Sequence, residues 1–462
     1  MTYSAKWIAQ ALQTHLVGEE QTITGGIHTD SRQCRPGSLY VARIGENADG
    51  HEYIDSAIEN GAVCILASKP QPERDAVSSI IVADTTEALG KIAAAHLKRL
   101  REQGDLTVIG ITGSVGKTTT KDLLVSILST AAPTVGSEKS YNNEVGMPLT
   151  VLRADDSTRY LVLEMGASGR GHLQYLTRIA PLDIAVELAV GKAHLGGFGN
   201  VDALARAKAE LVEGLVKGGC AILNRDDANV ASMSELVKGG KVVYYSAKGS
   251  HNAQIRATHV KLDENSCPHF DLEAGDVLKR VRLGLVGRHQ VSNALAAIAA
   301  SLRAGLNPET IVTAINGVSA TSPHRMHVVT RAGVTYIDDS YNANPDSMRA
   351  GLEVLGRIGE RAPRRVAVLG EMLELGPSSD ALHREAGQQA ADVDVNLLVS
   401  VGEGAKAITP PILGRAQCEH FDQYEDASAW LEENLREGDV VFLKGSNGSG
   451  VWKIADTLIG RE

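Results

Sequence analysis

The chain of 462 residues carries the segment Gly110-Ile111-Thr112-Gly113-Ser114-Val115-Gly116-Lys117-Thr118-Thr119-Thr120, and its fold class follows from this segment. An apolar run at 106–109 precedes it, and apolar residues at helical spacing follow it at 123–128. This pattern predicts a strand, a glycine loop and a helix. Glycines let the loop amides turn inward, and a helix N-terminus favours an anion. The segment therefore predicts a cradle for a nucleoside triphosphate.

Two side chains in this loop suit the same ligand. Lys117 offers a mobile positive charge for phosphate oxygens, and the Thr118 hydroxyl can ligate magnesium. The strict P-loop spacing places a glycine at position 111, which is Ile111 here. A tight turn without a ligand is the alternative, but Gly-Lys-Thr between a strand and a helix favours the phosphate loop. The predicted nucleotide contacts in the loop are Gly113, Ser114, Val115, Gly116, Lys117, Thr118 and Thr119.

The composition is that of a globular protein with many strand-to-helix turns, since glycine is abundant (47 residues) and aromatic residues are sparse (4%). A formal net charge of -10 argues against general nucleic-acid binding. No apolar run approaches the roughly 20 residues that span a bilayer, so we expect no membrane insertion. The five cysteines are scattered, and the N-terminus lacks a signal-peptide pattern. These features indicate a cytoplasmic protein.

Strand-like and helical segments divide the chain into three expected domains, 1–104, 105–322 and 323–462. A polar segment at 98–105 precedes the loop strand, and a turn-rich connection lies at 316–325. Beyond it, strands and helices alternate, which argues for a doubly wound, mostly parallel sheet. We therefore expect an α/β fold: a small N-terminal α/β domain, a central P-loop ATPase-like domain with a mostly parallel sheet, and a C-terminal Rossmann-like domain.

Four polar residues of the central domain are candidates for the site, and each has a structural alternative. Glu164 follows the strand 159–163, where a magnesium ligand or an ordinary strand-end glutamate would stand. His194 lies on a glycine-rich loop, as a ligand or a surface residue. Lys208 shares a helix face with leucines, so its amine would ordinarily reach water. Asn293 can bind an adenine edge or cap a helix.

Two clusters near the N-terminus have residues suited to a diphosphate. They are Thr29-Asp30-Ser31-Arg32 and Asp49-Gly50-His51. Hydroxyl groups and a guanidinium on a turn can hold phosphate oxygens. Turns capped by their own side chains explain the same residues equally well.

Taken together, these motifs resemble the Mur ligase family, and the resemblance covers nearly the whole chain. Further matching segments are 141–146, 194–199, 224–227 and 369–372. The stretch 338–348 is most similar to the members that add D-alanyl-D-alanine to UDP-N-acetylmuramoyl-tripeptide. The resemblance implies ATP-dependent amide synthesis through an acyl phosphate. A ligase for another amino acid and a nucleotide-dependent switch protein are the alternatives.

The resemblance also implies roles for particular residues. Lys117 and the loop amides would hold the phosphates of ATP, and Thr118 with Glu164 would ligate one Mg²⁺, with His194 at a second. Lys208 would be carbamylated and bind metal. Arg325, at the domain hinge, would contact the γ-phosphate on closure. The remaining assignments are Asn143, Asn293 and Asp339 for the nucleotide, Ser31 and Arg32 for the UDP portion, and Asn342 and Asn344 for the dipeptide.

Five residues depart from the pattern that the family commonly shows. Gln290, His324 and Asn447 stand where Asn, Gly and Arg are frequent, and Ala189 and Val190 replace a frequent Asn-Ile pair. We further expect a monomer.

Overall fold

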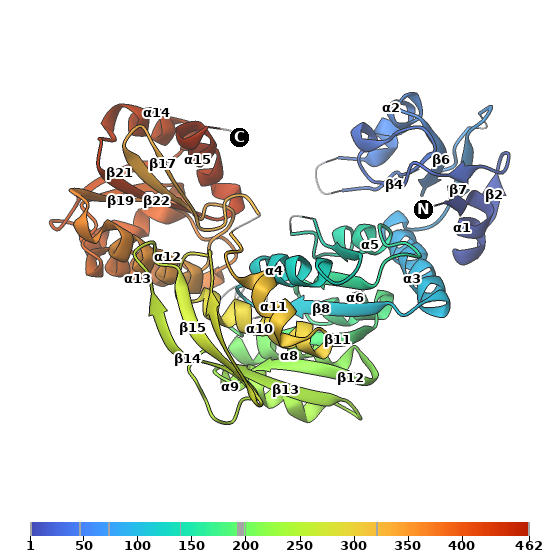
Figure 1. Ribbon diagram of the computed structural model, residues 1–462. Helices are drawn as coiled ribbons and strands as arrows, with labels where there is room; N and C mark the ends of the chain where they lie inside the picture. The colour runs from blue at the N-terminus through green and yellow to red at the C-terminus, as the bar shows by residue number, and fades with distance from the viewer. Residues whose placement is uncertain are drawn as a thin grey trace.

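The computed structural model describes residues 2–45, 48–72, 74–138, 140–191, 198, 200–319 and 322–460. Three α/β units follow one another along the chain, and each has its own main sheet. In Figure 1 the N-terminal unit (blue) and the C-terminal unit (orange to red) stand apart, both above the central unit (cyan to yellow). The expected α/β fold class, with a mostly parallel central sheet, is confirmed.

The N-terminal unit holds a small sheet with the strand order β2-β7-β6-β5-β4 and a separate β1-β3 pair. Its central strand β6 (Ala62–Ala67) is almost continuously apolar, as expected for a strand covered on both faces. A long helix, α3 (Thr85–Gln103), is capped by Asp84 and leads to the central unit. The other elements are β1 (Tyr3–Ser4), α1 (Ala5–Ala11), β2 (Leu16–Val17), β3 (Thr22–Ile23), β4 (Ile27–His28), β5 (Ser38–Val41), α2 (Ile54–Glu59) and β7 (Ser78–Ile81).

The central unit holds a nine-stranded sheet with the order β16-β15-β14-β13-β12-β11-β8-β10-β9. Strands β8 to β14 run parallel, and β15 and β16 extend the edge antiparallel. The strands are β8 (Thr107–Thr112), β9 (Thr134–Gly136), β10 (Tyr160–Glu164), β11 (Leu182–Glu187), β12 (Leu215–Asn224), β13 (Lys241–Ser246), β14 (Ile255–Leu262), β15 (Pro268–Ala274) and β16 (Val277–Arg282).

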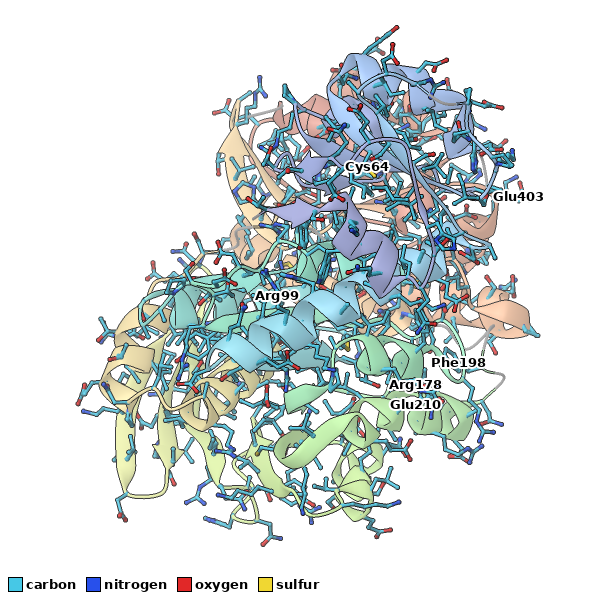
Figure 2. The ribbon with its side chains drawn as sticks, turned by 90° about the vertical axis from the view of Figure 1, so that its right-hand side faces the viewer. Cys64, Arg99, Arg178, Phe198, Glu210 and Glu403 are labelled. Carbon is cyan, nitrogen blue, oxygen red and sulfur yellow. The ribbon has the colours of Figure 1, made fainter. Side chains whose placement is uncertain are left out.

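Helices cover both faces of the central sheet. Alternate residues of β8 point to opposite sides, so Ile109 packs in one apolar core with α4, α10 and α11, while Val108 packs in another with α3, α5 and α6. Figure 2 labels Arg178 on α6 and Glu210 on the neighbouring helix α8. The Glu210 carboxylate accepts hydrogen bonds from two amides at the start of α6. The helices are α4 (Lys117–Ser129), α5 (Gly146–Val151), α6 (His172–Ile179), α8 (Val201–Glu213), α9 (Ala228–Ser232), α10 (Gln290–Arg303) and α11 (Pro308–Ile315).

The C-terminal unit is the doubly wound sheet that the sequence predicts. Its strand order is β17-β18-β22-β19-β20-β21, parallel except for the β17-β18 pair. Ala367 and Leu369 of β19 pack with α12 and α13, while Val366 and Val368 pack with α14 and α15. The elements are β17 (His327–Arg331), β18 (Val334–Asp338), α12 (Pro345–Ile358), β19 (Arg364–Gly370), α13 (Ser379–Asp392), β20 (Leu397–Val401), β21 (Gln417–Phe421), α14 (Tyr424–Asn434), β22 (Asp439–Lys444) and α15 (Val451–Ile459).

Strand β8 is longer than the apolar run at 106–109 predicts, because it continues through Gly110 to Thr112. A Cβ atom on Gly110 would lie 2.5 Å from the Leu182 side chain, so the glycine serves close packing inside the sheet. The phosphate loop is therefore confined to residues 113–116, and α4 begins at Lys117. Among the described residues, no helix is both long and apolar enough to cross a membrane.

Candidate active site

A cavity of about 860 Å³ lies between the central and C-terminal units. Its central wall comes from the loop before α4 and from the carboxyl ends of β10 and β11, which is where ligands bind in open parallel sheets. Its C-terminal wall comes from the segment after β18, the first turns of α12 and the loop after β22. Residues on the two walls include Ser114, Lys117, Thr118, Glu164, Asn293, Arg325, Asp339, Asn342, Asn344 and Lys444.

The loop before α4 has the geometry of a phosphate cradle. Gly116 has a φ of +84°, and a Cβ there would lie 2.2 Å from Asn293 Oδ1, so both backbone conformation and space require glycine. Lys117 Nζ donates to the carbonyl oxygen of Gly113 at 2.8 Å, which folds the side chain back over the loop. Burial lowers the pKa of the Lys117 ammonium. The loop thus presents amides and a partly desolvated cation to the cavity.

Oxygen atoms from α4 and β10 meet beside this loop. Thr118 Oγ1 donates to Glu164 Oε2 at 2.9 Å, and Asn142 Nδ2 donates to Glu164 Oε1 at 2.8 Å. Glu164 is buried at the last position of β10. The Ser140 hydroxyl lies 3.2 Å from that of Thr118. A hydroxyl and a carboxylate at this spacing are the hard oxygen donors that Mg²⁺ prefers.

Arg325 reaches this group of oxygens from the connection between the central and C-terminal units. Its Nη2 atom donates to Thr118 Oγ1 and to Ser140 Oγ, both at 3.1 Å. Its guanidinium also lies over the Tyr341 ring, 4.2 Å from the centroid. The residue that the family resemblance assigns to the hinge is thus already in contact with the phosphate-loop helix.

Lys208 is buried, so the alternative in which its amine reaches water is wrong. It is 2% exposed on α8 and interacts electrostatically with Glu187 and Lys117. Burial lowers the pKa of Lys208 and raises the pKa of Glu187, while attraction between the two opposes both shifts. The Glu187 carboxylate accepts no hydrogen bond from the part of the chain that the structure describes. An amine with a lowered pKa beside the phosphate loop suits covalent modification or metal binding.

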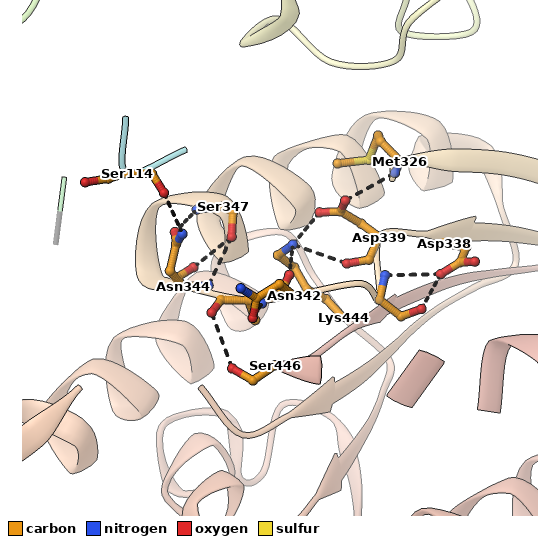
Figure 3. Close-up of polar contacts among 11 residues, drawn as sticks. Ser114, Met326, Asp338, Asp339, Asn342, Asn344, Ser347, Lys444 and Ser446 are labelled. Carbon is orange, nitrogen blue, oxygen red and sulfur yellow. Dashed lines mark hydrogen bonds and ion pairs between the residues drawn. The ribbon is translucent and has the colours of Figure 1, made fainter. Parts of the chain in front are cut away.

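The C-terminal wall is held together by a buried ion pair (Figure 3). Lys444, the last residue of β22, pairs with the Asp339 carboxylate and donates to the carbonyl oxygen of Asn342 at 3.0 Å. Asp339 Oδ1 accepts from the Met326 amide at 3.1 Å. Asn344 caps α12 and extends Nδ2 towards the carbonyl oxygen of Ser114, 3.5 Å away. This wall therefore touches the phosphate loop directly.

The structure gives the contacts of two asparagines that the sequence assigns to the nucleotide. Asn293 does not cap a helix, because α10 already begins at Gln290. The side-chain Nδ2 of Asn293 instead donates to Gln290 Oε1 at 2.8 Å. Asn143 is exposed, and its Oδ1 accepts from the amide of Gly146 at 2.9 Å. Its neighbour Asn142 lines the cavity instead. Sequence gave no signal to separate these adjacent asparagines.

Ser31 and Arg32 lie in the N-terminal unit, and neither belongs to the described lining of the cavity. The local-capping alternative is observed here: Asp30 caps the 3₁₀ turn η1 (Ser31–Gln33) and pairs with Arg32 at 2.7 Å. Asp49 likewise caps η2 (Gly50–Tyr53) and bonds to His51. Arg32 remains mostly exposed, with 85% of its side chain accessible. His194 lies outside the described residues.

The fold and the cavity define a P-loop nucleotide-dependent enzyme whose site is completed by a second, Rossmann-like unit. Family models match three consecutive segments: the Mur ligase family catalytic domain at residues 24–97, the Mur ligase middle domain at 111–301, and the Mur ligase glutamate ligase domain at 324–447. The chain belongs to the Mur ligase family.

Similarity to individual members extends over nearly the full length. A UDP-N-acetylmuramoyl-tripeptide–D-alanyl-D-alanine ligase from Mycobacterium tuberculosis (strain ATCC 25618 / H37Rv) is 40% identical, and the alignment covers 95% of this chain and 92% of that protein. The crystal structure of MurF from Acinetobacter baumannii superposes with a TM-score of 0.87 at 30% identity, covering 100% and 99% of the two chains. MurF from Thermotoga maritima in complex with ADP gives 0.78 at 28%, covering 94% and 96%.

Proposed function

We propose that this chain is an ATP-dependent ligase that joins D-alanyl-D-alanine to UDP-N-acetylmuramoyl-tripeptide in peptidoglycan precursor synthesis. The observation that carries the proposal is the convergence of a phosphate loop, an acid–hydroxyl pair and a hinge arginine on one cavity between two units. The relatives that bear this activity in their names match almost the whole chain. The ADP bound to the Thermotoga maritima protein supports the use of ATP here.

The reaction proceeds in two displacements. A carboxylate oxygen of the tripeptide bonds to the γ-phosphorus of ATP, and the bond from that phosphorus to the bridging oxygen breaks, releasing ADP. The neutral amine of the dipeptide then attacks the acyl carbon, phosphate leaves with the carbon–oxygen bonding pair, and the amine loses a proton. Phosphoryl transfer depends on positioning and charge neutralisation. Lys117 of the phosphate loop and Arg325 of the connection between the two units would supply these.

The C-terminal wall protects the intermediate from water. Arg325 and Asn344 contact the central unit at Thr118 and Ser114, so both units enclose the phosphate loop. An acyl phosphate in an open cleft would be hydrolysed before the dipeptide reacted. This enclosure explains why the site needs residues from two units.

Thr118 and Glu164 would hold Mg²⁺, which would neutralise charge on the transferring phosphates. The described residues contain no cluster of three or more His, Cys, Asp or Glu side chains suited to a metal. Mg²⁺ is commonly bound by one or two protein ligands together with substrate phosphates and water, so the pair fits it. The predicted second metal ligand, His194, keeps this role as part of the proposal.

Lys208 is the residue that we propose to be carbamylated. Its ammonium group would lose one proton, and the neutral amine would then add carbon dioxide and lose a second proton, which converts a buried cation into an anion. Burial favours the neutral amine that this reaction requires. Removal of bicarbonate and carbon dioxide should lower turnover, and their return should restore it. Full activity of Lys208→Ala in bicarbonate-free buffer would contradict the role.

The remaining assignments distribute the substrates over the three units. Asn293, behind Gly116, would contact adenine, with Asn143 and Asp339 also serving the nucleotide. Ser31 and Arg32 would contact the UDP portion, and Asn342 and Asn344 the dipeptide. We place the domains at 1–104, 105–322 and 323–462, and we propose a cytoplasmic monomer. The five unpaired cysteines are consistent with a reducing compartment.

One assay tests the proposed reaction. The protein is incubated with ATP, Mg²⁺, UDP-N-acetylmuramoyl-tripeptide and D-alanyl-D-alanine, and phosphate release is followed beside the product mass. We expect phosphate release that depends on both substrates, together with a product that combines them. Parallel reactions with single amino acids in place of the dipeptide test a different ligase. Phosphate release without the combined product would refute the assignment.

A further inference from the structure

The residues that flank Arg325 have an unusual backbone. His324 has a φ of +57° and Met326 a φ of +53°. Both values lie in the left-handed region, which residues other than glycine rarely adopt. Such conformations persist where surrounding contacts hold them in place. Arg325 therefore projects from a segment whose shape is fixed by its neighbours.

The side chain of His324 supplies several of these contacts. Its Nδ1 lies 2.8 Å from Asp338 Oδ2, and its Nε2 lies 3.6 Å from Asp456 Oδ1. The imidazole packs edge-on against the Trp452 ring at 6.1 Å. Because both ring nitrogens face carboxylates, the arrangement suits a doubly protonated imidazolium. The hydrogen bond to Asp338 raises the pKa of His324, in agreement with this geometry.

Backbone contacts fix the same segment from the other side. The Met326 amide donates to Asp339 Oδ1 at 3.1 Å, and the Tyr341 amide donates to the carbonyl oxygen of His324 at 3.1 Å. The consecutive residues Asp338 and Asp339 thus hold the residues on either side of Arg325. From this base the guanidinium reaches Thr118.

We propose that His324 is a positioning residue for Arg325, acting as an imidazolium held between Asp338 of β18 and Asp456 of α15. The inference rests on the proposed function, in which Arg325 contacts the transferring phosphoryl group. His324 itself would touch neither substrate nor nucleotide. Its effect should appear in the chemical step, because a displaced arginine weakens the transition state more than the binding of ATP.

The pH dependence has a defined sign. The groups that face the imidazole are Asp338 from β18, Asp456 and Trp452 from α15, and the Ser340 hydroxyl at 3.4 Å. The folded pKa of His324 lies above its ordinary value, so the imidazolium is present below that pKa and is lost as the pH rises through it. Above that pH the ion pairs disappear, and a neutral hydrogen bond to Asp338 remains.

Two variants separate the charge from the hydrogen bond. His324→Asn keeps a donor near the position of Nδ1, carries no charge and tolerates a left-handed backbone. His324→Gly relieves the backbone but removes every side-chain contact. His327→Asn, at an exposed position on β17, is the matched control. The full chain is assayed with ATP and both peptide substrates, and kcat and KM are measured across pH.

We expect His324→Gly to lower kcat about tenfold, with the KM for ATP changed by less than about twofold. The ratio of wild-type to His324→Asn kcat should fall from about fivefold near pH 6.5 to about one near pH 9, as the wild-type imidazole becomes neutral. His327→Asn should retain the wild-type profile.

Three outcomes would overturn the inference. A pH-independent ratio for His324→Asn would remove the role of charge. Lower melting temperatures with unchanged kcat would show that His324 serves only the stability of the fold. If His324→Gly fails to fold, His324→Asn still tests whether His324 affects kcat. If the wild type turns over and both variants match it, only this inference fails. If the wild type makes no product, the proposed function fails with it.

Discussion

Two lysines line the same cavity from opposite walls, and their surroundings differ. Lys444 pairs with the Asp339 carboxylate and donates to a backbone carbonyl within its own unit. Lys117 donates to the Gly113 carbonyl, and no ion pair involving it is found among the described residues. Burial lowers the pKa of both ammonium groups. The C-terminal wall therefore neutralises the positive charge of Lys444 internally. The central wall instead leaves the positive charge of Lys117 available for an anionic ligand.

The largest effect should come from Lys117→Ala. Without this charge, the γ-phosphoryl group loses direct stabilisation, and we expect turnover to fall by about three orders of magnitude or more. The melting temperature should not fall, because the variant removes a desolvated cation that forms no ion pair with a carboxylate among the described residues. Phosphate release and thermal unfolding measure the two quantities.

Lys98→Ala is the control for this comparison, since Lys98 is an exposed lysine on α3. It should change neither turnover nor melting temperature. Retained turnover in Lys117→Ala would contradict the contrast between the two walls.

Lys444→Met should mainly reduce the stability of the fold, in contrast to Lys117→Ala, which should mainly reduce turnover. The change leaves Asp339 in a largely buried position without its cation, and breaking a buried pair in this way costs about 3–5 kcal/mol. Urea denaturation should show the loss as a lower midpoint. Adding Asp339→Asn to the variant should recover part of it, since the unpaired charge is then removed. An unchanged urea midpoint would show that the charge of Lys444 does not stabilise the fold.

The contrast between the walls also explains what the sequence could predict. The phosphate loop and Glu164 follow from local rules: glycines between a strand and a helix, and a carboxylate at the carboxyl end of the next strand in the sheet. Glu187 obeys the same rule at the end of β11, beside β8.

The C-terminal wall depends on contacts between distant residues, which local patterns do not carry. Asp339 and Lys444 are 105 positions apart, and their pairing requires that β18 and β22 be neighbours. The contact between Arg325 and Thr118 spans 207 positions. The family resemblance supplied the role of Arg325, whereas strand and helix patterns alone leave its partner open. Burial of Lys208 was likewise invisible, because helical spacing does not show what packs against a face.

Arg325→Lys tests the bridge between the walls. Lysine keeps the charge but loses the planar group that lies over Tyr341 and donates to two hydroxyls at once. We expect kcat to fall by about 10- to 100-fold, with a smaller change in the KM for ATP. Steady-state kinetics measures both.

Arg361→Lys provides a matched control, because Arg361 is exposed in η4 (Gly359–Arg361). It should match the wild type. Wild-type kcat in Arg325→Lys would mean that charge alone suffices at this position.

Asn344 connects the walls most weakly, and two variants divide its contributions. Asn344→Ala removes the cap of α12 and should cost about 1 kcal/mol of stability, whereas Asn344→Ser retains a capping oxygen. Both lose the Nδ2 group that lies 3.5 Å from the Ser114 carbonyl. If that group orders the dipeptide side of the cavity, the KM for D-alanyl-D-alanine rises in both variants, while urea denaturation shifts only in Asn344→Ala. A KM change confined to Asn344→Ala would instead trace the effect to a frayed helix, and the contact with the phosphate loop would then have no part in substrate binding.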